Sequence, residues 1–108
     1  MGGYLERKYI NKVLGNNGFE PYTDGYYLWS EFIAAGLSQT EPFLQNHISL
    51  CLYLSNKLGM KSPAIVDQNL RRWRVQPQNC EYSNKQLYNK LIHEVLEMET
   101  LDLADKKY

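Results

Sequence analysis

The sequence predicts an all-α protein, a compact bundle of five to six helices that contains a helix-turn-helix. Apolar residues recur at helical spacing in successive segments, and the residues between the segments are ones that cap or end helices. No segment combines sustained alternation with β-branched residues, so a sheet has little support. A chain of 108 residues has room for one core. We therefore expect one helical domain over residues 1–98 and a polar C-terminal tail over residues 99–108.

The first two helices are expected over residues 4–14 and 25–35. The segment 15–18, Gly-Asn-Asn-Gly, ends the first helix because these residues tolerate positive φ. Thr23 or Asp24 caps the second helix, and Gly36 ends it. The expected inward-facing residues are Leu5, Tyr9, Ile10, Val13 and Leu14 in the first helix and Leu28, Trp29, Phe32 and Ile33 in the second.

A third helix is expected to begin at residues 40–42, with Thr40 as N-cap and Pro42 in the first turn. Its apolar positions are Leu44, Ile48, Cys51, Leu52 and Leu58. This pattern fits one helix to residue 57 or 58, and it fits equally well two shorter helices broken near residues 47–49. The last helix is expected over residues 85–98, capped by Ser83 or Asn84, with the stripe Leu87, Leu91, Ile92, Val95 and Leu96.

Residues 49–74 are the most informative part of the chain. Gly59 is placed where a left-handed residue would end a scaffold helix, and Ser62-Pro63 is a typical helix start. In the helix that follows, over residues 63–74, Val66, Leu70 and Trp73 form a stripe that would pack on the core. This order of helix, glycine turn and arginine-bearing helix is how a helix-turn-helix places a recognition helix in the DNA major groove.

The face of this helix that is not apolar carries residue types suited to DNA. The candidate base contacts are Ala64, Asp67, Gln68 and Arg71, and the candidate phosphate contacts are Lys57, Lys61, Ser62, Arg72 and Arg74. Arginine reads guanine with two hydrogen bonds and glutamine reads adenine, whereas phosphate contacts position the protein without specifying a sequence. Asp67 either accepts from a cytosine amino group or orients Arg71, four residues along.

The net charge of the chain is zero, but the charge is unevenly distributed. Residues 57–74 contain five basic side chains and one acid, and residues 94–105 contain five acids and no basic side chain. We therefore expect a bipolar molecule. A positive face attracts phosphate even when the whole protein is neutral.

The chain resembles the C-terminal DNA-binding domain of the master sporulation response regulator of endospore-forming Firmicutes. Residues 25–29 (GYYLW) are similar to the Gly-Tyr-x-Tyr-Leu element of that family, and residues 54–58 (LSNKL) resemble its scaffold helix. Residues 66–71 (VDQNLR) match its Val-Glu-Arg-Ala-Ile-Arg recognition pattern in character, and residues 83–87 (SNKQL) correspond to its closing helix. The resemblance implies an all-helical fold, a transcription-related role, double-stranded DNA as partner and a homodimer on DNA. Gln68 replaces a family arginine, and the segment 75–82 is shorter than its family counterpart.

An alternative hypothesis is that the protein is a non-catalytic protein–protein interaction module built on the same kind of scaffold. The acidic C-terminal stretch and a cluster of aromatic residues, Tyr22, Tyr26, Tyr27 and Trp29, motivate it. An alternative interpretation places Tyr26 and Trp29 in the core and leaves the other two half buried. These two functions remain open at the level of sequence.

The sequence argues against an enzyme, a metal site and a cofactor. His47 and His93 are far apart in the chain, no glycine-rich phosphate loop is present, and Cys51 and Cys80 cannot form a metal framework. We therefore expect no small-molecule substrate. No apolar run approaches the roughly 20 residues needed to span a bilayer, so we expect no membrane partner and a cytoplasmic, reduced location.

Overall fold

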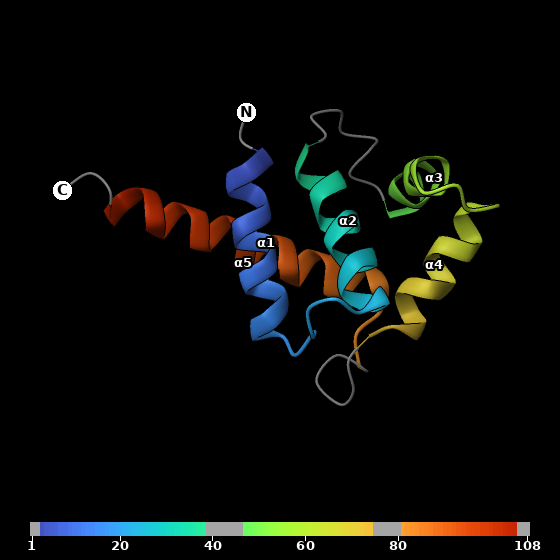
Figure 1. Ribbon diagram of the computed structural model, residues 1–108, viewed down its shortest axis with the longest axis horizontal. Coiled ribbons are helices and arrows are strands. Elements are labelled where there is room, and N and C mark those ends of the chain that lie inside the picture. The colour runs from blue at the N-terminus through green and yellow to red at the C-terminus, as the bar shows by residue number, and fades with distance from the viewer. Residues whose placement is uncertain (1–2, 39–46, 75–80, 106–108) are drawn as a thin grey trace.

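A computed structural model describes residues 3–38, 47–74 and 81–105 of the chain. Within these ranges all regular structure is helical, as predicted, and five helices are present: α1 (Gly3–Asn16), α2 (Asp24–Ser38), α3 (His47–Lys57), α4 (Pro63–Arg72) and α5 (Asn84–Asp105). Helix α2 lies between α1 on one side and α3 and α4 on the other, and α5 crosses behind α1 and α2 (Figure 1). No described helix is long and apolar enough to cross a membrane.

The turn between α1 and α2 forms as predicted. The amide of Phe19 donates to the carbonyl of Leu14 at 3.0 Å, and Gly18 takes a φ of 90°, which is the usual geometry of a glycine-terminated helix. Of the two predicted caps of α2, Thr23 performs the role, because its Oγ1 accepts from the amide of Tyr26 at 3.2 Å. Gly36 does not end α2, which continues to Ser38.

The start of α3 in the structure is His47, and the predicted start at residues 40–42 lies outside the described residues. Its inward stripe is only partly as predicted. Cys51 is buried, but Ile48 and Leu52 are 71% and 51% exposed, while Leu50 and Leu54 are fully buried instead. The apolar run from residue 48 to residue 54 offers two candidate faces, and packing against α2 and α4 selects the one that contains residues 50 and 54.

Helix α4 ends at Arg72, two residues earlier than predicted, with Trp73 as its C-cap. Val66 and Leu70 are buried as predicted, but Trp73 is 39% exposed and is only partly packed. The Cβ of Trp73 lies so close to the backbone of Gly25 that a Cβ at that position would be 2.9 Å away. The end of α4 therefore rests on the start of α2.

Helix α5 is capped by Ser83, which forms a reciprocal pair of hydrogen bonds with Gln86. The amide of Gln86 donates to Ser83 Oγ at 3.1 Å, and the amide of Ser83 donates to Gln86 Oε1 at 2.9 Å. The helix runs to Asp105, seven residues beyond its expected end, so most of the expected tail is helical. Leu87, Leu91 and Val95 are buried, but Leu96, predicted to face inward, is 45% exposed.

The core is centred on the fully buried Trp29. Its ring packs against Phe19 and, edge on, against Phe32 at a centroid distance of 5.6 Å, and Phe32 packs against Tyr88 of α5 at 4.8 Å. The indole Nε1 donates to the carbonyl of Leu70 at 3.0 Å, which satisfies the buried donor and ties α4 to α2. The position of α4 is therefore set by the core.

Candidate nucleic-acid interface

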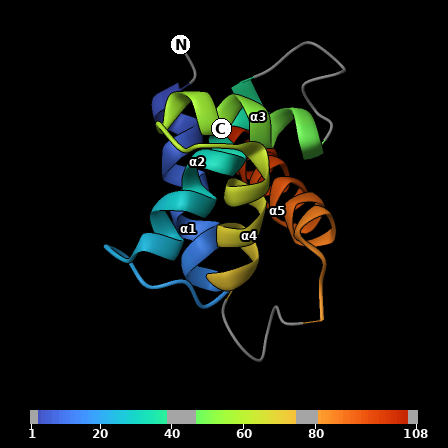
Figure 2. The same cartoon turned by 90° about the vertical axis from the view of Figure 1, so that its right-hand side faces the viewer.

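Helix α4 follows α3 after a five-residue turn, residues 58–62. Gly59 takes a φ of 71°, and the amide of Met60 donates to the carbonyl of Ser55 at 2.8 Å, so glycine ends α3 as predicted. Ser62 is the N-cap of α4, since its Oγ accepts from the amide of Ile65 at 3.3 Å. The two helices pack against each other, with α4 facing the viewer in Figure 2.

Three of the four predicted base-contact residues lie on the outer side of α4. Ala64, Gln68 and Arg71 are exposed and follow one another at helical spacing of four and three residues. The side chain of Arg71 is 64% exposed. These three positions form a face that is open to a partner along the length of the helix.

Asp67 differs from its three neighbours because its side chain is only 33% exposed and is hydrogen-bonded to α5. Its Oδ1 and its carbonyl oxygen each accept from Asn84 Nδ2 at 2.8 Å, which joins α4 to the start of α5. Its Oδ2 lies 3.5 Å from Arg71 Nη2. Of the two roles considered for Asp67, the structure therefore provides the contact for orienting Arg71.

The predicted phosphate contacts divide into two groups. Lys61 and Arg72 are exposed beside the outer face of α4, and the Arg72 guanidinium lies 5.5 Å from the centroid of the Trp73 ring. The other three have partners within the molecule. Ser62 caps α4. Lys57 Nζ lies 3.2 Å from Glu31 Oε1. Arg74 is half-buried, and its Nε donates to the carbonyl of Arg71 at 3.3 Å. Lys57 is also exposed, at 46%, but it pairs with the nearly buried Glu31. Among the described residues, Lys61, Arg71 and Arg72 are therefore the exposed cations of this region without an ionic partner on another helix.

Glu31 explains why Lys57 is engaged. The Glu31 side chain is 9% exposed, and its Oε2 also forms an ion pair with Arg7 Nη2 at 2.8 Å. One carboxylate of α2 therefore joins α1 and α3. Burial alone would raise the pKa of Glu31, but the hydrogen bonds and charges of Arg7 and Lys57 outweigh burial and hold it below its usual value. Lys57 contributes to the fold in this arrangement.

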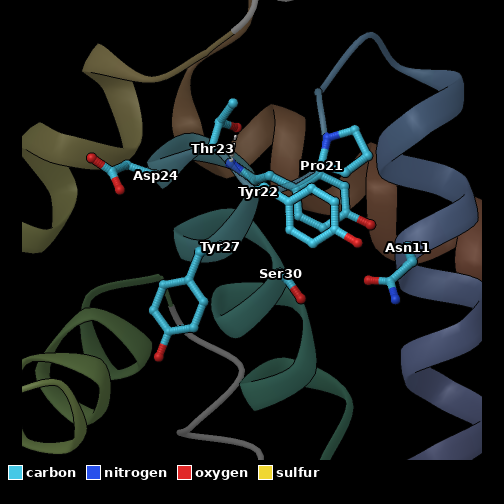
Figure 3. A pocket seen from close by; sticks show the side chains of 8 residues that line it. Asn11, Pro21, Tyr22, Thr23, Asp24, Tyr27 and Ser30 are labelled. Atoms are coloured by element: carbon cyan, nitrogen blue, oxygen red, sulfur yellow. Dashed lines mark hydrogen bonds between the residues drawn. The ribbon is translucent and has the colours of Figure 1, made fainter.

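A hollow of about 420 Å³ lies at the start of α2, and sequence reasoning did not identify it (Figure 3). Its lining comes from α1, the turn before α2 and α2 itself: Asn11, Pro21, Tyr22, Thr23, Asp24, Tyr26, Tyr27 and Ser30. Tyr22 is fully exposed with a φ of 68°, and Tyr27 is 56% exposed. Tyr26 is half-buried and Trp29 is core, so only part of the predicted aromatic cluster reaches the surface. In the sequence, only the aromatic run at residues 26–29 pointed to this hollow. Nothing in the sequence indicates the positive φ of Tyr22, whose ring is at the surface.

A second hollow of about 410 Å³ shares Asp24 and Tyr27 with the first one and reaches α4. Its remaining lining residues are Leu28, Leu58, Met60, Asn69, Arg72 and Trp73. The two hollows therefore lie on either side of the exposed Tyr27 ring. The second one brings an aromatic surface next to the end of the predicted recognition helix.

Metal-binding and nucleophilic groups contribute little to these surfaces. Among the described residues, no group of three or more His, Cys, Asp or Glu side chains is arranged to hold a metal ion. Burial, with a smaller contribution from Asp67, raises the pKa of the Cys51 thiol to about 12, so this side chain is protonated and acts in packing.

No protein-family model matches the chain, and a search of curated proteins and of solved structures returns no significant match. The class of protein that the fold defines is an all-α helical bundle. The resemblance to the sporulation regulator remains a prediction based on the quoted residues.

Proposed function

We propose that this protein is a sequence-specific DNA-binding protein and a transcriptional regulator that works in the cytoplasm, with α3 and α4 acting as a helix-turn-helix. The observation that carries the proposal is the outer face of α4. Ala64, Gln68 and Arg71 are exposed on a capped helix whose opposite side, Val66 and Leu70, is fully buried. Lys61 and Arg72 flank this face.

In the proposed complex, α4 lies in the major groove. Arg71 donates to a guanine and Gln68 pairs with an adenine, while the small side chain of Ala64 permits close approach to a base edge. Asp67 holds the Arg71 guanidinium from its own helix, so that less side-chain freedom is lost on binding. Asp67 itself is satisfied by Asn84 and stays out of the groove.

The phosphate contacts in this complex come from Lys61 and Arg72. Lys57 remains with Glu31, and Arg74 remains with the carbonyl of Arg71. A complex with these two cations at phosphates loses affinity with salt at a slope of roughly −0.9 per phosphate in a double logarithmic plot. A second copy of the protein on the same DNA would double this slope.

The first prediction concerns Arg71. We expect Arg71→Ala to weaken binding to the preferred site roughly 10- to 100-fold and to relax the preference at one base pair, because one two-bond guanine contact is lost. The measurement is fluorescence anisotropy on a site selected from a random duplex library, at several salt concentrations. Lys12→Ala is the matched control, since it removes an exposed positive charge on α1.

Two results would overturn the proposal. One is a library selection at low salt that enriches no sequence. The other is an Arg71→Ala protein that binds the selected site as tightly as the parent does.

The alternative function, a protein-interaction module, is favoured by the two hollows that flank Tyr27. Exposed aromatic rings beside a concave surface are a common basis for protein contacts. Retention of a protein partner that depends on Tyr27, by a chain that shows no DNA sequence preference, would favour this function over DNA binding.

A further inference from the structure

The outer side of α5 carries a row of residues with the spacing of a coiled-coil seam. Steps of four and three alternate along Lys85, Asn89, Ile92, Leu96, Glu99 and Leu103. Leu96 and Leu103 are 45% and 49% exposed. Ile92, in the middle of the row, is half-buried. The row is distinct from the buried face of α5, which consists of Asn84, Leu87, Tyr88, Leu91 and Val95.

The C-terminal part of α5 extends beyond the rest of the bundle. Figure 1 shows it projecting past α1 toward the C-terminal end. The exposed leucines of the row lie in this half of the helix, where Leu96 and Leu103 have the exposure given above. A projecting helix with an apolar row is suited to pairing with another helix.

The charges of α5 favour a second copy in antiparallel orientation. Residues 84–93 contain two lysines and no acid, whereas residues 94–105 contain five acids and no basic residue. Lys90 and Glu94 already pair with each other, and Asp102 accepts from Tyr9, so the complementarity rests on the charges of the row. On the row itself, Lys85 lies near one end and Glu99 near the other, and neither forms an ion pair among the described residues. A helix with this distribution is complementary to an antiparallel copy of itself.

We infer that α5 pairs antiparallel with α5 of a second copy of this chain, across the row from Lys85 to Leu103. The register follows from the spacing: Ile92 meets Leu96 of the second copy, Asn89 meets Glu99, and Lys85 meets Leu103. The two central layers are then apolar, the next layers join an amide to a carboxylate, and the lysine stems cover the outer leucines. A parallel pair would instead place Glu99 on Glu99 and Lys85 on Lys85, with like charges in contact.

The predicted dimer is weak and is independent of DNA binding. A single pair of helices buries less area than a standard stable interface, so its dissociation constant is expected in the micromolar range. The row contains no residue of α4, so a failure of the DNA-binding proposal leaves the inference intact.

The second prediction tests, in the full chain, whether two copies pair through this row of α5. Leu96→Asp is expected to raise the dimer dissociation constant roughly 100-fold, because both copies lose an apolar contact and gain a charge at the centre of the row. The measurement is sedimentation equilibrium over a concentration series, with far-UV circular dichroism to verify folding. Leu101→Asp is the control, since Leu101 is more exposed, at 62%, but lies off the row, so its dimer is expected to be unchanged.

The register is tested by disulfide cross-linking in a Cys80→Ser background. A protein carrying both Asn89→Cys and Glu99→Cys is expected to form covalent dimers, and Asn89→Cys alone is expected not to. A wild-type chain that stays monomeric up to about 1 mM, or a Leu96→Asp chain that dimerises normally, overturns the inference. Efficient cross-linking of Asn89→Cys to itself overturns the antiparallel arrangement.

Discussion

Gly36 is the position at which a single atom matters most. The hydroxyl end of the Tyr88 ring lies where a side chain at residue 36 would be, and an added Cβ would overlap the tyrosine oxygen. Tyr88 cannot turn away easily, because it is buried and packs against Phe32. The missing side chain therefore permits the contact of α2 with α5 at this position.

The third prediction is that Gly36→Ala lowers the free energy of unfolding by about 2 kcal/mol or more, because an overpacked core must rearrange. The measurement is urea denaturation followed by circular dichroism. Gly15→Ala is the control: nothing lies within 4 Å of the added Cβ there, so we expect a gain of roughly 0.5–1 kcal/mol. Tyr88→Phe should recover part of the loss in the Gly36→Ala protein, and additive costs would contradict a direct clash.

At the scale of elements, the ion pairs of Glu31 join three helices. Arg7 of α1 and Lys57 of α3 both meet this carboxylate of α2, and Ser30 accepts a further bond from Arg7 at 2.8 Å. The two cations are 40% and 46% exposed, so solvent weakens each pair. The buried carboxylate still requires both partners, because an unpaired buried charge is costly.

The fourth prediction follows from the lowered pKa of Glu31. The ionised form is favoured by the fold, so its contribution is complete at neutral pH and is lost as the pH falls from the unfolded-state value near 4.5 through the lower folded-state pKa. We expect Glu31→Gln to be less stable than the parent by about 1–2 kcal/mol at pH 7, with a difference that shrinks toward pH 3. Urea denaturation at a series of pH values measures this. Glu20→Gln, at an exposed position, should show no such trend, and a pH-independent cost at Glu31 would contradict the assignment.

The starts of α2, α4 and α5 and the turn after α3 were predictable, because capping residues and turn glycines act locally, whereas Gly36 does not end α2 and α5 runs past its expected end. Thr23, Gly59, Ser62 and Ser83 all perform the roles expected of them. The inward face of α3 was not predictable, since an unbroken apolar run has more than one candidate face and only its neighbours decide between them. The candidate site shows the same division. The exposure of Gln68 and Arg71 follows from helical spacing, whereas the engagement of Lys57 and Asp67 depends on residues 26 and 17 positions away in the chain.

At the scale of the whole molecule, α5 and α1 are joined at both ends of their contact. At one end, the side-chain amide of the buried Asn17 makes two contacts with α5. Its Nδ2 donates to Glu94 Oε1 at 2.9 Å, and its Oδ1 accepts from Lys90 Nζ at 2.5 Å. At the other end, Tyr9 donates its hydroxyl hydrogen to Asp102. The expectation of a polar tail from residue 99 onward rested on composition, and composition does not reveal that one of its acids is the acceptor for a tyrosine of α1.

The fifth prediction concerns a chain that ends after Met98. The fully buried residues of α5 precede this point among the side chains that the structure describes, so we expect the shortened protein to fold, with a thermal midpoint lower by about 5 °C. The hydrogen bond to Asp102, followed by burial, raises the pKa of Tyr9 to about 12. Because the folded-state pKa lies above the unfolded-state value of 10, this bond stabilises the full chain below pH 10, and its effect is lost as the pH rises toward 12.

Tyr9→Phe separates this bond from the other effects of the deletion. The substitution should destabilise the full chain and add nothing in the shortened one, so the two changes form a double-mutant cycle measured by thermal denaturation. Equal effects of Tyr9→Phe in both lengths would show that Asp102 is not the relevant acceptor. The same shortened chain lacks Leu103 and Glu99, so it should also dimerise more weakly than the parent, which links the stability of the end of α5 to the proposed pairing of two copies.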